Sequence, residues 1–93
     1  MKTGIEIIAE ERQRQIDVEC WSEIYDRRHT DGQLSAAAAS YALPRQWRKP
    51  ADLIPATWPW SKAWWKPTPD NRIKELAKAG ALIAAEIDRL NRI

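Results

Sequence analysis

The chain has 93 residues, 15 basic and 13 acidic side chains, and a net charge of +2. This length supports one small domain over residues 1–93, and the small net charge argues against a dedicated duplex-DNA binder and against an acidic DNA mimic. The single cysteine, Cys20, cannot form an internal disulfide, and no signal core or membrane span is evident in the sequence. These properties predict a cytoplasmic protein with no membrane partner.

The first predicted helix covers about residues 4–20. Thr3 and Glu6 have the spacing of a capping box at its start. Apolar residues recur at helical spacing along one stripe, which also contains an arginine: Ile5, Ile8, Arg12 and Ile16. Arg12 has two interpretations. It either lies at the core edge, paired with a carboxylate, or it points into a pocket where its guanidinium binds a phosphate.

The second predicted helix covers about residues 31–43 and follows a second possible capping box, Thr30 with Gln33. Pro44 ends it. One side of this helix carries mostly small residues, namely Leu34, Ala37, Ala38, Tyr41 and Ala42. We expect this alanine face to allow close approach of a neighbouring helix.

The third predicted helix covers about residues 69–92, with Thr68 as N-cap and Pro69 in the first position. Its apolar stripe comprises Ile73, Leu76, Gly80, Ile83, Ala84, Ile87 and Leu90. We expect this stripe to pack against the alanine face. A close contact would explain Gly80, which costs about 1 kcal/mol relative to alanine inside a helix.

Residues 44–68 form a connection that contains five of the six tryptophans and most of the prolines. Its prolines predict irregular structure. In a chain without phenylalanine, Trp58, Trp60 and Trp64 are expected to supply core volume. Trp47 and Trp65, which lie beside Arg48 and Lys66, are expected to be exposed and able to stack on bases. The fold class is therefore predicted to be all-α, with three main helices, a Trp/Pro-rich connection and a core completed by oligomerisation.

The residue types offer little support for catalysis. One cysteine and one histidine are too few for a metal site of that type, and no glycine-rich phosphate loop is present. MazG-like pyrophosphatases hold magnesium with a Glu-Glu-x-x-Glu helix and a Glu-x-x-Asp pair. Glu10 and Glu11 are followed by Arg14 at the third place, so the first motif fails, whereas Glu23 to Asp26 fits the second. No catalytic residue, metal ligand or cofactor is assigned.

The start of the second helix is a candidate anion site. Asp26 and His29 precede it, and the backbone N–H groups of a helix start favour a bound anion. The alternative is that His29 and Asp31 only cap and orient the loop.

Five short stretches, ERQRQI, HTDGQL, WPW, WWKP and KAGALI, resemble a family of small bacteriophage and prophage proteins along nearly the whole chain. Cys20 departs from that pattern, since glycine commonly precedes the tryptophan that matches Trp21. The resemblance implies a phage setting. Small phage proteins often act against host defence by binding immune proteins or by sequestering signalling nucleotides.

We therefore expect a counter-defence protein of the host cytoplasm, homo-oligomeric, that sequesters a nucleotide without catalysis. The alternatives are a protein-binding inhibitor of a host defence or regulatory protein, a MazG-like hydrolase and a binder of single-stranded nucleic acid. The candidate ligand-binding residues are Arg12, Trp21, Asp26, His29, Asp31, Trp47, Arg48, Trp65 and Lys66.

Overall fold

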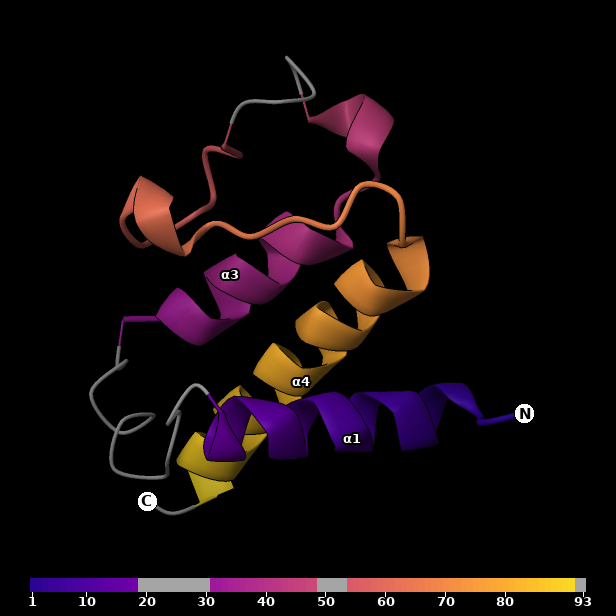
Figure 1. Ribbon diagram of the computed structural model, residues 1–93. Helices are drawn as coiled ribbons and strands as arrows, with labels where there is room; N and C mark the ends of the chain where they lie inside the picture. The colour runs from indigo at the N-terminus through magenta and orange to yellow at the C-terminus, as the bar shows by residue number, and fades with distance from the viewer. Residues whose placement is uncertain (19–30, 49–53, 92–93) are drawn as a thin grey trace.

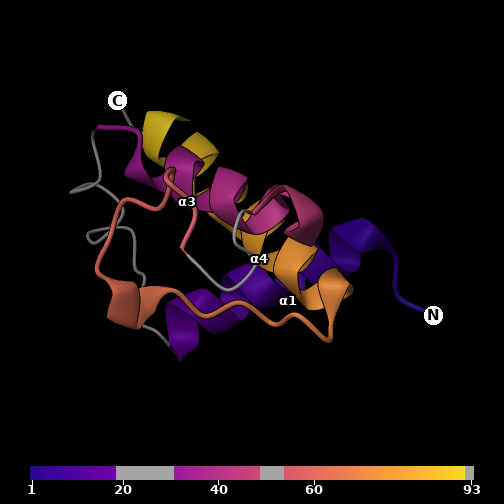
Figure 2. The ribbon, with the colours of Figure 1, turned by 90° about the horizontal axis from the view of Figure 1, so that it is seen from above.

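The computed structural model describes residues 1–18, 31–48 and 54–91. Helix α4 lies between α3 and α1 and contacts both (Figures 1 and 2). The described residues contain no strand, and the all-α prediction is confirmed. None of the helices in this part of the chain has the length and apolarity needed to span a bilayer. The elements are α1 (Gly4–Asp17), α3 (Gln33–Ala42), the 3-10 turns η1 (Arg45–Trp47) and η2 (Lys62–Trp64), and α4 (Arg72–Asn91).

Helix α1 begins with the predicted capping box. The Glu6 backbone N–H donates to the Thr3 hydroxyl across 3.2 Å, and the Thr3 N–H donates to the Glu6 carboxylate across 3.0 Å. The hydrogen bond from the Thr3 backbone N–H, followed by the Thr3 side chain, holds the pKa of the Glu6 carboxyl group below its ordinary value of 4.5. The local sequence alone therefore determines where α1 starts.

The starts of the other two helices differ from the prediction. Gly32 is the N-cap of α3 with a left-handed φ of 82°, and the Gln33 side chain accepts from the Asp31 N–H. Gln33 is the first helical residue and not the third, so it does not hold the position that the predicted capping box requires; Thr30 lies outside the described residues. Helix α4 starts at Arg72, because Asn71 accepts from the Lys74 N–H across 3.1 Å in the manner of an N-cap. The predicted N-cap at Thr68 is therefore wrong.

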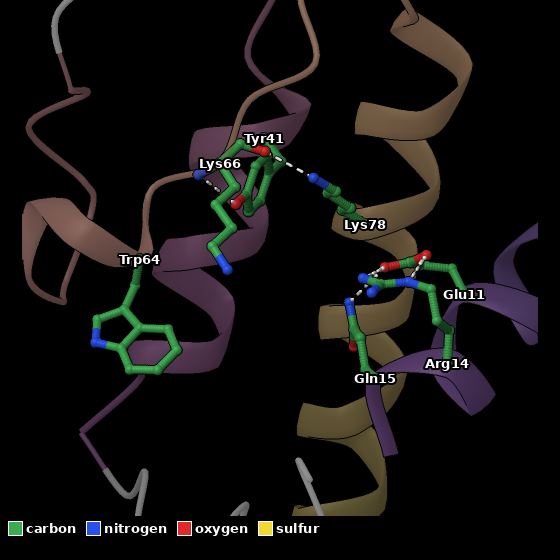
Figure 3. Close-up of a pocket in the computed structure, with 7 residues that line it drawn as sticks. All are labelled: Glu11, Arg14, Gln15, Tyr41, Trp64, Lys66 and Lys78. Carbon is green, nitrogen blue, oxygen red and sulfur yellow. Dashed lines mark hydrogen bonds and ion pairs between the residues drawn. The ribbon is translucent and has the colours of Figure 1, made fainter. Parts of the chain in front are cut away.

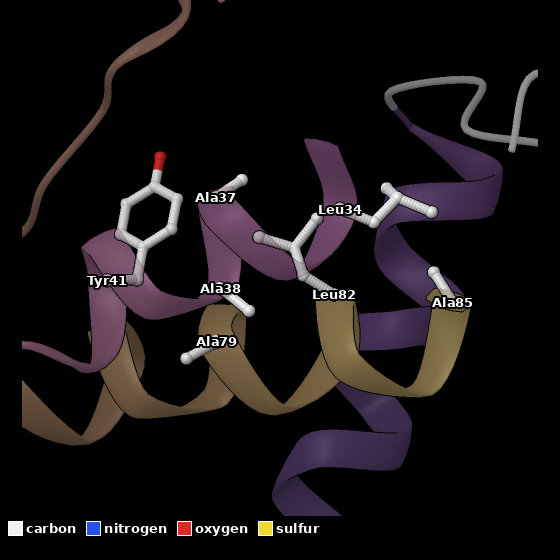
Figure 4. Close-up of a cluster of buried hydrophobic side chains, with 7 residues drawn as sticks. All are labelled: Leu34, Ala37, Ala38, Tyr41, Ala79, Leu82 and Ala85. Carbon is white, nitrogen blue, oxygen red and sulfur yellow. The ribbon is translucent and has the colours of Figure 1, made fainter. Parts of the chain in front are cut away.

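The core lies between α3 and α4 (Figure 4). The alanine face of α3 is buried there as predicted, and α4 contributes small residues in return. Short side chains on both helices permit close backbone approach, which increases dispersion contacts along the whole interface. The buried residues of this cluster are Leu34, Ala37, Ala38, Tyr41, Ala79, Leu82 and Ala85.

The face of α4 that packs on α3 is not the predicted one. The apolar stripe stays largely exposed, with Ile83 at 48% and Ile87 at 52%. Gly80 does mark a close helix contact, but with α1. A Cβ atom at Gly80 would lie 2.6 Å from Ile8 Cδ1. The sequence periodicity predicted an interface along the Ile and Leu stripe of α4. The alanines on another side of α4 pack more closely against α3 than that stripe would.

Candidate functional site

Tyr41 anchors the Trp-rich connection to the helices. Its ring stacks on Trp65 with centroids 4.8 Å apart, and Trp58 meets it edge-on at 5.5 Å. Its hydroxyl accepts a hydrogen bond from the Lys66 backbone N–H across 3.2 Å. Trp60 in turn packs edge-on against Trp58 at 5.3 Å. Three of the tryptophans, Trp58, Trp60 and Trp65, thereby cover the α3–α4 core.

Trp64 has the opposite environment and is 57% exposed. The Lys66 ammonium lies 5.7 Å from the Trp64 ring centroid, which is a cation–π contact. Trp65 is instead enclosed between Tyr41 and the Arg48 guanidinium, which lies 5.4 Å from its centroid. The predicted roles of these two neighbours are therefore wrong, because Trp65 packs on the core and Trp64 faces outward.

Beside Trp64 lies an open depression of about 590 Å³, which we call the cationic hollow. Three separate parts of the chain form it: α1, the connection and α4. Its volume is within the usual range for small-molecule sites. Four of its six lining residues are cationic, and none is acidic. The lining residues are Arg14, Val18, Trp64, Lys66, Lys74 and Lys78.

A small enclosed cavity of about 20 Å³ adjoins the hollow and shares four of its residues (Figure 3). It has room for about one water molecule. Glu11, the carboxylate that lines it, accepts two hydrogen bonds from the Arg14 guanidinium at 2.8 and 2.6 Å. Gln15 donates to the same carboxylate across 3.3 Å. Glu11 therefore fixes the direction of Arg14 at the boundary between cavity and hollow.

The lysines of the cationic hollow fall into two groups. Lys78 is buried, and its ammonium donates to the Lys66 carbonyl across 2.6 Å and lies 5.4 Å from the Tyr41 ring centroid. Lys66 and Lys74 are exposed, and their ammonium groups form no ion pair with any described residue. Lys78 thus stabilises the wall, whereas Lys66 and Lys74 can turn to a bound anion.

The buried side chain of Gln15 offers a further polar group. It is 1% exposed, and its Oε1 atom has no hydrogen-bond donor among the residues that the structure describes. A buried acceptor without a donor is costly. A ligand N–H or a water molecule in the adjoining cavity would satisfy it.

Arg48, a predicted ligand contact, belongs to a buried structural cluster. Its guanidinium pairs with Glu75 at 3.2 Å and donates to the Tyr41 carbonyl at 3.0 Å. Arg72 also donates to the Tyr41 carbonyl, at 2.9 Å, and to Glu75, at 3.1 Å. Both cations thereby compensate the unpaired carbonyls and partial negative charge at the C-terminus of α3. The ligand role of Arg48 stays a prediction: its charge and its two terminal nitrogens are used within the fold, whereas its buried Nε atom has no hydrogen-bond partner among the described residues.

Glu75 completes this cluster with 2% of its side chain exposed. Burial raises the pKa of its carboxyl group. Hydrogen bonds and charge from Arg48, with further hydrogen bonds from Arg72 and the Thr68 N–H, outweigh burial and hold the pKa below 4.5. The carboxylate therefore stays ionised and keeps the end of α3, the connection and the start of α4 together.

The other predicted site residues that the structure describes do not all lie at one place. Of the six described, only Lys66 lines the cationic hollow. Arg12 lies 3.8 Å from Asp88 with 12% of its side chain exposed. Asp31 is exposed at the start of α3, and Trp47, 67% exposed as predicted, borders another depression. Trp21, Asp26 and His29 lie outside the described residues.

The structure describes two of the four carboxylates that the MazG-like hydrolase alternative depends on. Glu10 pairs with Lys2 at 2.7 Å, and Glu11 pairs with Arg14. Glu23 and Asp26 fall in the range that is not described. Over the described ranges, no three His, Cys, Asp or Glu side chains form a group that could bind a metal ion.

Sequence reasoning missed most of the hollow: Arg14, Trp64, Lys74 and Lys78. A signal was present, since Arg14, Trp64 and Lys78 lie within the ERQRQI, WWKP and KAGALI stretches. Their convergence depends on long-range packing, which spacing along the chain does not reveal. No protein-family model, curated protein or solved structure matches the chain.

Proposed function

We propose that the protein binds a phosphate-bearing small molecule of the nucleotide class in the cationic hollow and sequesters it without a catalytic step. The main support for this proposal is the composition of the hollow. Four cationic side chains from three separate parts of the chain surround a single depression that also presents an exposed indole. Cations bind phosphate, and an exposed aromatic ring stacks on a base.

The available groups are sufficient for useful affinity. Lys66 and Lys74 can each form a charge-assisted contact with phosphate, worth about 1.5–3 kcal/mol. Stacking of a base on Trp64 is worth roughly 1–3 kcal/mol. Together with the positive charge of Lys78, these contacts can exceed the entropic cost of association and give about micromolar affinity, whereas the charge of Arg14 is already paired with Glu11.

The dimensions favour a nucleotide over a simple anion. A volume of about 590 Å³ is far larger than a single phosphate needs. The Gln15 Oε1 atom lines the adjoining cavity of about 20 Å³, so a water molecule held there could donate to it and bridge to a base or a sugar hydroxyl. The resemblance to small phage proteins makes an immune signalling nucleotide the more specific form of the proposal.

Isothermal titration calorimetry tests the proposal directly. The panel comprises inorganic phosphate, ATP, cyclic dinucleotides, cyclic trinucleotides and ADP-ribose. We expect at least one nucleotide to bind, and Lys66→Gln or Lys74→Gln to weaken it by roughly 5- to 50-fold. Lys62→Gln is the matched control, since Lys62 is exposed in the same connection but does not line the hollow. No binding across the panel, or equal binding by all three variants, would contradict the proposal.

Product analysis separates sequestration from hydrolysis. The bound nucleotide is incubated with the protein and magnesium and then recovered by chromatography. Intact nucleotide supports sequestration. Magnesium-dependent release of pyrophosphate that is lost in Glu23→Gln would instead support the MazG-like alternative.

A further inference from the structure

Helix α4 carries a row of exposed aliphatic side chains, which is interrupted at Gly80, where Ile8 of α1 packs. With Gly80 included, the row has spacings of three and four, so it lies along one face of the helix. We call this surface the α4 seam. It comprises Ile73, Leu76, Ile83, Ile87 and Leu90, exposed by 64%, 46%, 48%, 52% and 51%.

Helix α1 adds apolar side chains beside the middle of the α4 seam. Ile8 packs on Gly80, which occupies the vacant position of the same stripe. Two further aliphatic residues of α1, Ile5 and Ile16, lie on the stripe of Ile8 and are 82% and 36% exposed. The described core contains only three large apolar side chains that are buried, Leu34, Tyr41 and Leu82. Among the described residues, more large aliphatic side chains are therefore exposed than buried.

We infer that the α4 seam is the interface of a homodimer in which a second copy of this chain presents the same surface. The number of exposed apolar side chains favours this occupant. Seven of them lie on the α4 seam and on the stripe of Ile8 and can supply the apolar part of a homodimer interface. A stable homodimer buries about 800 Å² per partner, about two thirds of it apolar.

The charges near the seam also fit a second copy. The α4 seam itself contains no charged residue. Two carboxylates of α4 nearby are already compensated within the chain: Asp88 lies 3.8 Å from Arg12, and Glu86 accepts from Arg89 and Ser35. Identical copies with a net charge of +2 can therefore bring this surface together without strong like-charge repulsion.

Sedimentation equilibrium of the full chain tests the inference. We expect a concentration-dependent mass that approaches twice 10.8 kDa. Ile87→Glu should shift the protein to monomer, because it places a charge in the dry interface. Ala39→Glu is the matched control, since Ala39 is an exposed alanine of α3 away from the seam. It should leave the dimer intact.

Circular dichroism checks that each variant remains helical, and Ile83→Gln provides a milder second variant if Ile87→Glu fails to fold. A dimer that persists in both seam variants would overturn the inference, as would wild-type protein that stays monomeric up to about 100 μM. Either result would leave the seam to a different protein partner. Nucleotide binding in the cationic hollow is measured separately, so the two proposals can fail independently.

Discussion

The Lys66 backbone N–H donates to the Tyr41 hydroxyl across 3.2 Å, and this bond positions the Trp-rich connection on α3. On one side of the bond, Trp65 stacks on Tyr41. On the other, Trp64 and the Lys66 side chain face the cationic hollow. The Tyr41–Lys66 contact therefore links the packing of the core to the composition of the site.

Replacing Tyr41 by phenylalanine tests this link. The ring and its stacking remain, but the acceptor for the Lys66 N–H is lost. We expect the free energy of unfolding to fall by about 0.5–1.5 kcal/mol in urea titrations. We also expect nucleotide affinity to fall a few-fold, because Trp64 and Lys66 lose their fixed positions. Reduced stability with unchanged affinity would show that the bond does not position the site.

Glu75 should make the free energy of unfolding depend on pH in the acid range. Its pKa in the folded state is lower than the ordinary 4.5, so the unfolded chain takes up the proton first as the pH falls. The stabilisation is therefore complete above about pH 4.5 and is lost as the pH falls through the folded-state pKa. Glu75→Gln removes this contribution and leaves Arg48 without a buried counter-charge, which costs about 3 kcal/mol at neutral pH.

The measurement is urea unfolding of wild type and Glu75→Gln between about pH 6 and about pH 3. The difference in unfolding free energy should shrink toward the acid end. Other carboxylates contribute equally to both proteins, so the comparison isolates Glu75. A difference that stays constant with pH would be inconsistent with a lowered pKa.

Gly80 should be intolerant of large side chains because α1 packs directly on it. Gly80→Leu would drive Ile8 and α1 away from α4, at a cost of about 1–3 kcal/mol in unfolding free energy. Removing the obstructing atoms with Ile8→Ala should recover part of this loss. A double-mutant cycle by thermal or urea unfolding measures the coupling. Additive effects of the two substitutions would refute the contact.

Much of the fold could be predicted from local signals. The Thr3–Glu6 capping box, the alanine face of α3 and the irregular connection all depend on residues close in sequence. The packing of α4 could not be predicted, because two of its faces are plausible interfaces. The larger Ile and Leu side chains gave the stronger periodic signal, whereas α3 packs on the alanines and Leu82, where the backbones approach closely.

The site was less predictable than the fold, because its composition also depends on contacts between residues that are far apart in the sequence. Whether Trp64 or Trp65 faces solvent depends on which one stacks on Tyr41, a residue more than twenty positions away. Arg48 looked like a phosphate ligand from its basic and aromatic neighbours. Its role in the fold follows from Glu75, which sequence spacing alone does not bring near it.

Binding in the cationic hollow should weaken as salt increases. Lys66 and Lys74 are exposed, so their attraction to phosphate is screened over about 10 Å at 0.1 M salt. We expect nucleotide affinity in calorimetric titrations to fall steadily between about 0.05 and about 0.5 M NaCl. The Lys66→Gln variant should show a shallower dependence than wild type. An affinity independent of salt would assign binding to uncharged contacts elsewhere.

Fluorescence of Trp64 tests the central claim most directly. A nucleotide that stacks on its indole should quench emission in a saturable manner in wild type and in Trp47→Phe, the matched control with an exposed tryptophan outside the hollow. This quench should disappear in Trp64→Phe and weaken in Lys66→Gln. A quench that persists unchanged in Trp64→Phe, or no quench with any nucleotide of the panel, would contradict this claim.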